Sequence, residues 1–431
     1  MIRSVFARFL RTSCAGAVTL TLVSVGFSSA LMAAPASGGP RQLVLLHQLD
    51  ADRHQALSEL ATRFNQSRQD FVVRVEAGSW QEGAQAHMLI TEGEAAERFL
   101  AARTPRYKPV HAAMREAGLP LQAVKPPPVV PRHTVDAQGR LLALPVGMST
   151  PVLYVNRDAL RRAGLNPDMP LQTWSGLQEA LDRLFDAGST CPYTVAEPGR
   201  VMIENASAWH NEPVTRTEAR RELPRFNGML QIKHVALMAS WHRAQFMRIY
   251  PDAREAESRF ARGECATIAA SSSSWPSFRR QGGFELGIAS LPYHDDMPGA
   301  PQNTLADGAM LWLTAGHKPA EYKAMAAFVN FWLQPENQVH WQRETGYLPL
   351  NRSGFLAAES NLLGDDLENI RVAVAQLVNK RTTPASSASI LTGQAGTLRL
   401  VDQALEDVWS GRKPAKQALD EAVMQLQMPA R

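Results

Sequence analysis

The stretch Ser-Thr-Pro-Val-Leu-Tyr-Val-Asn at residues 149–156 decides the fold that the sequence predicts. A turn-forming Ser-Thr-Pro leads into a short apolar run, and Pro151 cannot donate a ladder hydrogen bond, so it belongs at a strand's first residue or edge. Asn156 and Asp158 then open a predicted helix that Gly164 ends. This strand starts on a proline and leads into a helix far into the chain. We interpret it as the point where the chain crosses from one lobe to the other. The alternative is a loop leading into one more core strand.

The residues between the N-terminal segment and this stretch predict a β-α-β unit. A buried strand at 43–46 is followed by an amphipathic helix at 54–65, and a second strand lies at 71–75. Apolar residues recur in the helix at i, i+3, i+4 and i+7, which is the helical period: Leu57, Leu60, Ala61 and Phe64. Such a unit begins a mostly parallel sheet, so the predicted class is α/β.

The same patterns continue after the crossing. Strands are predicted at 265–270, 284–292 and 309–314, and helices from Thr173 and at 321–333, 336–343, 397–409 and 416–428. A proline-rich linker lies at 126–131, and no internal repeat is found.

The N-terminus reads as a secretory signal. Arg3, Arg8 and Arg11 form a basic region, an apolar stretch follows at about 15–31, and Ala-Pro-Ala at 34–36 is a small-residue cleavage site. A transmembrane anchor is the alternative, but the stretch is short and interrupted by polar residues. Cys14 lacks the preceding pattern of a lipoprotein, so no lipid anchor is expected.

Composition excludes several classes of function. The chain has 45 basic and 41 acidic residues, and three of the arginines lie in the predicted signal. No basic block interleaved with aromatics is present, so nucleic acid is not an expected partner. No Cys/His cluster has metal-ligand spacing, so no metal or other cofactor is predicted. Cys191 and Cys265 are left after cleavage, either as a disulfide or as two buried thiols.

Signals for binding are stronger than signals for catalysis. Gly147 to Pro151 lacks the second glycine of a nucleophile elbow, and no phosphate-binding glycine loop is found. The four serines Ser271 to Ser274 follow a predicted buried strand and precede a predicted helix. They form either an anion-binding site or a polar cap of that helix. Tyr347 lies in a turn, either as a hydroxyl donor in a cleft or as a core residue. Arg399 lies among apolar residues. It is either an ion-paired residue or an arginine that binds a phosphate through two guanidinium N–H groups.

Several stretches together resemble a known family. They are residues 149–156, 204–209, 263–271, 300–303, 345–349 and 417–420, which occur in order at family spacing. From about residue 43 to residue 428 the chain resembles the family 1 extracellular solute-binding proteins of bacterial ABC importers, and within them the periplasmic binders of sn-glycerol-3-phosphate. The resemblance implies a two-lobed fold like that of the maltose-binding protein.

The resemblance also implies a set of ligand-binding residues. The family's positions fall on Ser149, Trp174, Ser271, Gly308, Tyr347 and Arg399. Hydroxyls, a backbone N–H and an arginine would hold the phosphate, and an aromatic would cover the glycerol. In the first lobe the family's tyrosine is replaced by Trp80, and the following segment is shortened. A ligand-contacting glutamate therefore falls on Glu94 or Glu92.

The resulting prediction is a type II periplasmic binding protein. Residues 1–36 form the signal peptide, 37–150 and 308–351 form lobe 1, and 151–307 and 352–431 form lobe 2. The expected function is to capture sn-glycerol-3-phosphate or a related glycerophosphodiester as a monomer without a membrane anchor, and to deliver it to a permease and its ATPase. No catalysis is expected. The alternatives are a periplasmic phosphodiester hydrolase and a ligand-sensing protein for a different phosphorylated or sugar-like solute.

Overall fold

The computed structural model describes residues 40–79, 85–100, 106–119, 121, 134–218, 221–350, 352–362, 364–387 and 396–428. The predicted signal peptide, Trp80 and the predicted linker at 126–131 lie outside these residues. Among the residues described, none of the helices combines the length and the apolar character needed to cross a membrane.

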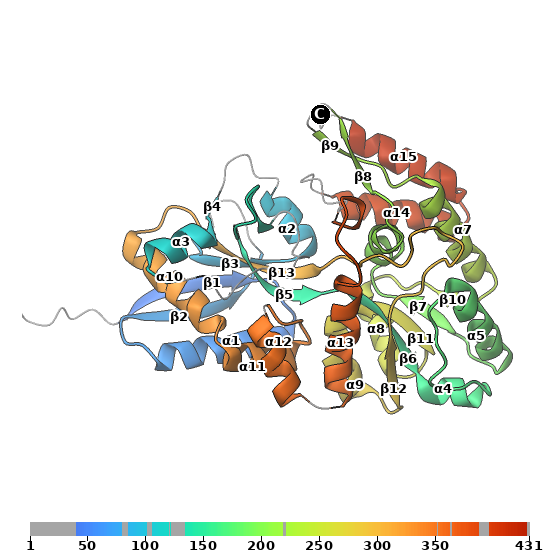
Figure 1. The fold of residues 1–431 in the computed structure, drawn as a ribbon, viewed down its shortest axis with the longest axis horizontal. Coiled ribbons are helices and arrows are strands. Elements are labelled where there is room, and N and C mark those ends of the chain that lie inside the picture. Colours follow the sequence, from blue (N-terminus) through green and yellow to red (C-terminus); the bar gives the residue numbers. More distant parts are fainter. Residues whose placement is uncertain are drawn as a thin grey trace, which may run out of the picture. The chain divides into compact units, whose positions relative to one another are not determined.

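Figure 1 shows the fold. Within the described residues, the first sheet contains six strands. Its order is β2 (Phe71–Ala77), β1 (Arg41–His47), β3 (Met88–Thr91), β13 (Asp307–Thr314) and β4 (Tyr107–Lys108), with β5 (Leu144–Ser149) also paired to β13. Strands β1, β2 and β3 are parallel, whereas β13 runs antiparallel to its neighbours. Helix α1 (Ala51–Gln66) connects β1 to β2, so the predicted β-α-β unit is confirmed.

The second sheet contains five strands in the order β10 (Met247–Arg248), β7 (Tyr193–Val195), β11 (Thr267–Ser271), β6 (Pro151–Asn156) and β12 (Leu286–Ala289). Strand β6 is antiparallel to both of its neighbours. It begins on Pro151, at the strand's first residue as predicted, because a proline there removes no ladder bond. Strands β8 (Thr215–Glu218) and β9 (Arg221–Pro224) form a separate hairpin.

The chain changes sheets at Thr150. Strand β5 ends on Ser149 in the first sheet, and β6 starts on Pro151 in the second. The chain returns to the first sheet between β12 and β13. The predicted crossing is therefore a change of sheet at Thr150, whereas the predicted lobe limits stay a prediction.

Helices cover both sheets. The α-helices α2 to α15 are α2 (Gly93–Leu100), α3 (Val110–Glu116), α4 (Arg157–Arg162), α5 (Trp174–Asp186), α6 (Ala206–Trp209), α7 (Met229–Arg243), α8 (Ala253–Ala261), α9 (Trp275–Gln281), α10 (Pro319–Trp332), α11 (Pro335–Thr345), α12 (Arg352–Asn361), α13 (Asp365–Leu377), α14 (Thr397–Trp409) and α15 (Ala415–Gln427). Short 3₁₀ turns form at Ser272–Ser274 and Ala385–Ser387, and a π-helix forms at Gly199–Asn205. The predicted helix at 397–409 agrees with α14, but the predicted strand at 284–292 is longer than β12.

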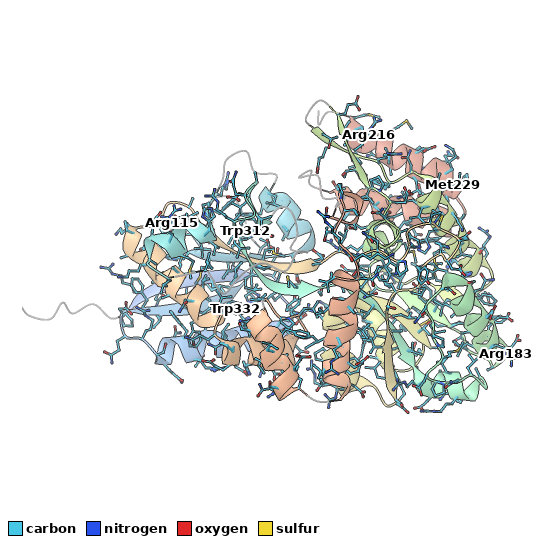
Figure 2. The ribbon with its side chains drawn as sticks, viewed as in Figure 1. Arg115, Arg183, Arg216, Met229, Trp312 and Trp332 are labelled. Carbon is cyan, nitrogen blue, oxygen red and sulfur yellow. A yellow bond between two sulfur atoms is a disulfide. The ribbon has the colours of Figure 1, made fainter. Side chains whose placement is uncertain are left out.

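Strand β13 shows how the first sheet is buried on both faces. Leu311 and Leu313 pack in one apolar cluster with Trp332, whereas Met310 and Trp312 pack in another. Figure 2 labels the two tryptophans, Trp312 and Trp332. Successive side chains of a strand point to opposite faces, which explains the alternation. A strand that is buried on both faces has a continuous run of apolar residues, and the sequence of β13 shows such a run.

Cys191 and Cys265 form a disulfide. They lie just before the neighbouring parallel strands β7 and β11, with their Cα atoms 4.5 Å apart. The sequence left this pairing open, because two cysteines carry no spacing pattern.

Candidate functional site

A cavity of about 750 Å³ is lined by residues from both sheets and from the helices and turns next to them. From the first sheet come the segment after β1, the start of α2, the end of β5, the start of β13 and the end of α11. From the second come residues of α8, the turn after β11, α9 and the segment after β7. The lining includes Ser149, Ser271, Gly308 and Tyr347 from the predicted set, together with Glu92, Arg53, Glu197, Glu257, Ser273, Ser274, Ser277, Arg280 and Asp307.

The serine run forms a hydroxyl-rich wall of this cavity. Strand β11 ends on Ser271, and the next three serines form a 3₁₀ turn that leads into α9. The Ser271 hydroxyl lies 2.8 Å from that of Ser273 and accepts from the Ser273 backbone N–H at 3.2 Å. The Ser274 hydroxyl donates to Glu257 at 2.6 Å. Ser271 therefore acts as the cap that the sequence suggested while it also lines the cavity.

Arg53 is the cation beside these hydroxyls. Its guanidinium donates to the Ser273 hydroxyl at 2.8 Å and to Asp50 at 3.0 Å. It also lies over the Tyr347 ring, 4.7 Å from the centroid. The charge of Arg53 is thus held by an aromatic face, a carboxylate and a serine from the other sheet. Sequence reasoning did not select Arg53. Its position in the first helical turn after a parallel strand could have indicated a site residue.

Tyr347 and Glu92 form a second polar contact in the cavity. The phenol of Tyr347 donates to the Glu92 carboxylate at 3.1 Å. Burial raises the pKa of Glu92, and the nearby Arg53 and the Tyr347 hydrogen bond only partly oppose this effect. Between the two glutamates that the sequence left open, Glu92 lines the cavity. The backbone of Glu94 lies in α2, and its side chain is outside the described residues.

Gly308 and Ser149 meet where β13 and β5 pair. Gly308 has φ +133°, and a Cβ there would overlap the carbonyl group of Gly147. Only glycine fits this backbone position. The Ser149 hydroxyl donates to the carbonyl of Asp307 at 3.4 Å. The sharp backbone at Gly308 thus brings the start of β13 to the cavity.

Trp174 is not among the residues that line the cavity, contrary to the sequence-based assignment. It is 3% exposed and belongs to the apolar cluster around the second sheet, where its ring lies 5.9 Å from that of Trp241 and 4.8 Å from that of His234. Thr173 caps the helix that starts on Trp174, and this cap turns the first helical residue toward the core. Tryptophan buries a large apolar area, which favours this position.

Arg399 also lies outside the lining of the cavity. It is an exposed residue in the first turn of α14, and the residues just before that helix, 388–395, are not described. Its role in binding therefore stays a prediction.

Carboxylates outnumber cations around the cavity, which the sequence did not indicate. Among the residues that the structure describes, seven acidic residues and three arginines line it. Some acids are neutralised: Asp50 pairs with Arg53, Asp52 with Arg280, and Asp307 with Arg200. Within the described structure the Glu257 carboxylate accepts a hydrogen bond from Ser274, and burial raises its pKa. The lining of the cavity thus combines arginines and several hydroxyls with an excess of carboxylates.

One cluster in the described residues has the ligand types of a metal site. His87, His317 and Glu321 lie within 4.8 Å of one another by their ligand atoms, but none of them lines the cavity. The Nδ1 atom of His87 accepts from the backbone N–H of Val44 at 3.1 Å. The proton of neutral His87 is then on Nε2, which leaves no lone pair there for a metal. The cluster does not fit a three-ligand site in this protonation state.

Comparison with known proteins agrees with this architecture. Residues 59–361 match the family described as bacterial extracellular solute-binding protein. The sn-glycerol-3-phosphate-binding periplasmic protein UgpB of Yersinia enterocolitica is 33% identical over 88% of this chain and 89% of its own. The corresponding protein of Pectobacterium atrosepticum is 31% identical over 91% and 92%.

Solved structures share the fold at lower identity. UgpB from Mycobacterium tuberculosis in complex with glycerophosphocholine superposes with a TM-score of 0.69 at 19% identity, over 90% of this chain and 98% of that one. Maltose-bound MalE3 of T. maritima gives 0.71 at 13% identity, over 90% and 99%. These likenesses show the two-lobed type II fold. The family match and the relatives show that the chain belongs to the bacterial extracellular solute-binding proteins, the substrate-binding components of ABC importers.

Proposed function

We propose that this protein captures a glycerol phosphate ester in the cavity and delivers it to an inner-membrane permease driven by an ATPase. The observation that carries the proposal is the serine wall beside Arg53, because hydroxyls and a guanidinium are strong donors to phosphate oxygens. Relatives above 30% identity that are named for sn-glycerol-3-phosphate support the same ligand class. Ser149, Ser271, Gly308 and Tyr347 are the proposed contacts from the sequence-based set.

The excess of carboxylates in the lining favours a ligand that carries a positive group besides its phosphate. A dianionic monoester carries no positive group that could pair with Glu92, Glu197 or Glu257. A zwitterionic diester has one negative charge for Arg53 and a cation for a carboxylate. We therefore expect glycerophosphocholine, which UgpB from Mycobacterium tuberculosis binds, to bind more tightly than sn-glycerol-3-phosphate.

Calorimetry on mature protein, refolded after a denaturing wash to remove bound ligand, tests the proposal. Glycerophosphocholine, sn-glycerol-3-phosphate, inorganic phosphate and maltose would be titrated separately. Saturable binding of either ester, without binding of maltose, supports the proposal. Binding of maltose alone, or of none of the four by folded protein, would contradict it.

The export, partner and non-enzymatic parts of the proposal have their own tests. Cleavage after Ala36 would give a periplasmic protein whose N-terminus is Ser37, readable by mass spectrometry. Loss of growth on the ester as sole phosphate source after deletion would favour transport over sensing. A phosphodiester hydrolase would release choline from glycerophosphocholine, and we expect no such turnover.

A further inference from the structure

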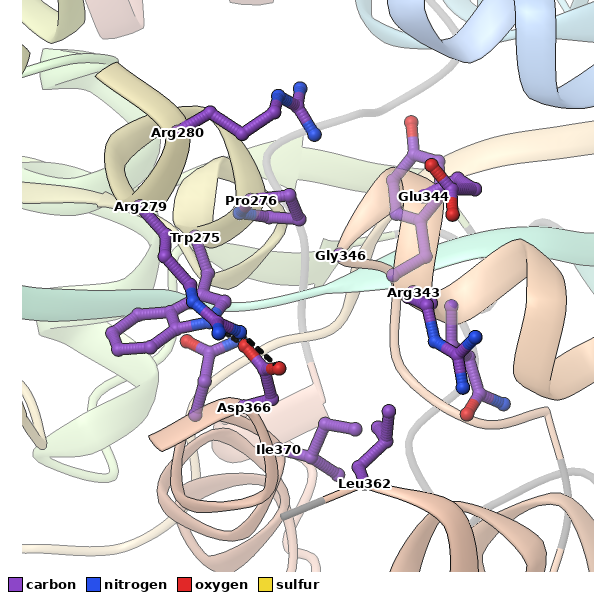
Figure 3. Close-up of a pocket in the computed structure, with 13 residues that line it drawn as sticks. Trp275, Pro276, Arg279, Arg280, Arg343, Glu344, Gly346, Leu362, Asp366 and Ile370 are labelled. Atoms are coloured by element: carbon purple, nitrogen blue, oxygen red, sulfur yellow. Dashed lines mark hydrogen bonds and ion pairs between the residues drawn. The ribbon is translucent and has the colours of Figure 1, made fainter. Parts of the chain in front are cut away.

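A second pocket, of about 360 Å³, lies between α9, α11 and α13. Figure 3 shows Arg279 and Asp366 on one side of it, Arg343 and Glu344 on the other, and Leu362 with Ile370 along its floor. Helix α9 follows a strand of the second sheet, whereas α11 follows α10 and the first sheet. The pocket is thus built by elements of both sheets.

A tight contact separates this pocket from the ligand cavity. Gly346 ends α11 with φ +70°, and a Cβ there would lie 2.6 Å from Cδ of Pro276 and 2.6 Å from the carbonyl oxygen of Ser273. The backbone after α11 therefore touches the start of α9. Gly346 lines the smaller pocket, Ser273 lines the larger cavity, and Pro276 lines both. Arg280, Glu344, Pro276 and Tyr347 line both.

Gln342 lines the pocket, and its side-chain amide has unused hydrogen-bonding groups. The residue is 4% exposed, and within the described structure neither its Oε1 nor its Nε2 atom has a hydrogen-bond partner. Native proteins satisfy nearly all buried polar groups, and an amide left with neither bond costs free energy. A group that both donates and accepts, such as a hydroxyl, would satisfy this amide.

The charge balance of the pocket is opposite to that of the ligand cavity. Three arginines and two carboxylates line it. Arg279 is paired with Asp366, and Arg280 with Asp52. No ion pair is found for Arg343 among the residues that the structure describes. An anion that enters this pocket finds one guanidinium free to bind it, and carboxylates are favoured partners of that group.

We propose that this pocket is a second binding site, for a small hydroxylated carboxylate. The carboxylate pairs with Arg343, the hydroxyl bonds the Gln342 amide, and the carbon chain lies against Leu362 and Ile370. The volume is within the range of small-molecule sites. This assignment is independent of the ligand proposed for the larger cavity.

Occupancy of the second site would be coupled to that of the ligand cavity. The two sites share walls, and elements of both sheets line each of them. A molecule bound between α9 and α11 favours one arrangement of these helices. By linkage, any change that it causes in the affinity for the ester must be matched by an equal change in its own affinity.

Calorimetry with citrate, L-malate and glycerate tests the site. We expect saturable 1:1 binding of at least citrate, and weaker binding, by fivefold or more, of tricarballylate, which is citrate without its hydroxyl. Gln342→Leu should remove the difference between these two acids, and Arg343→Gln should weaken citrate at least tenfold. Gln342→Leu removes an unsatisfied amide and keeps the side-chain size, so its melting temperature should not fall.

A control variant locates the binding. Arg183→Gln changes an exposed arginine on α5 and should bind citrate like the wild type. Two results would overturn the proposal: no saturable binding of any of the three hydroxycarboxylates, or citrate binding that survives both pocket substitutions.

Discussion

Arg53 lies beside the serine hydroxyls of the ligand cavity, whereas the resemblance assigned the phosphate-binding arginine to Arg399. Arg53 bonds a serine of the opposite sheet and lies over Tyr347, whereas Arg399 is exposed on α14. Arg53→Ala should weaken binding of the ester by roughly 10- to 100-fold, because a hydrogen bond to a charged group contributes about 1.5–3 kcal/mol. Calorimetry measures this loss.

The matched variants decide between the two arginines. Arg183→Ala removes an exposed arginine far along the chain on α5 and should leave affinity unchanged. If Arg399→Ala abolishes binding while Arg53→Ala has no effect, the sequence-based anchor is right and our preference for Arg53 is wrong.

Glu257 gives a pH dependence that needs no ligand. Burial raises the pKa of its carboxyl above the ordinary value of 4.5, against the opposing Ser274 hydrogen bond and Arg53 charge. The native protein then binds this proton more tightly than the unfolded chain, so stability falls as pH rises from 4.5 through the raised pKa. Glu257→Gln should melt higher than wild type at pH 7.5, and the difference should vanish near pH 4.5.

A surface glutamate provides the control for this effect. Hydrogen bonds from Arg262 and Arg259 lower the pKa of Glu264, so Glu264→Gln should not stabilise the protein at pH 7.5. Thermal scans of both variants from pH 4.5 to 8 are sufficient. A stabilisation by Glu257→Gln that does not change with pH would show that the charge of Glu257 is not its cause.

Gly308 fixes the backbone where the second crossing enters the first sheet. Gly308→Ala should destabilise the protein by about 3 kcal/mol, from left-handed strain and overlap with Gly147. Gly283→Ala is the matched control, since a Cβ there meets nothing within 4 Å. Denaturant unfolding compares the two, and equal stabilities would refute the assigned role of Gly308.

At the scale of elements, the disulfide holds β7 beside β11. It closes a loop of 74 residues, and cross-links of this span stabilise by about 4 kcal/mol in the chain-entropy account. The double variant Cys191→Ala/Cys265→Ala should lose about this much in urea unfolding, and reduced wild type should behave like the variant. If dithiothreitol leaves the wild-type midpoint unchanged, the bond does not stabilise the fold in this way.

Elements with a strong local pattern were predicted well. The helix at 397–409 and the strand that starts on Pro151 depend on apolar period and on proline chemistry, which are local. The predicted strand at 284–292 was too long, because only the four residues of β12, Leu286–Ala289, pair with β6. Pairing partners lie far away in the sequence, so strand length is decided by tertiary contacts.

At the scale of the whole molecule, the cavity is bridged by contacts between elements of the two sheets. Arg53 bonds Ser273, and Arg280 pairs with Asp52. A bound ester that replaces or reinforces these contacts should shift the population of lobe arrangements toward the closed form. Small-angle scattering should show a smaller radius of gyration with glycerophosphocholine, and no change with maltose. A radius that stays constant at saturation would count against hinge closure.

The sequence alone predicted the α/β class, the crossing at residues 149–156 and the family, and it selected four residues that line the cavity: Ser149, Ser271, Gly308 and Tyr347. These follow from local chemistry: apolar period, turn residues and motifs that keep their spacing. Only the tertiary structure decided that Trp174 packs in the core, that Arg53 stands beside the serine wall, and that the two cysteines pair. Arg53 and Ser273 are 220 residues apart, and no local pattern records which distant side chains the fold brings into contact.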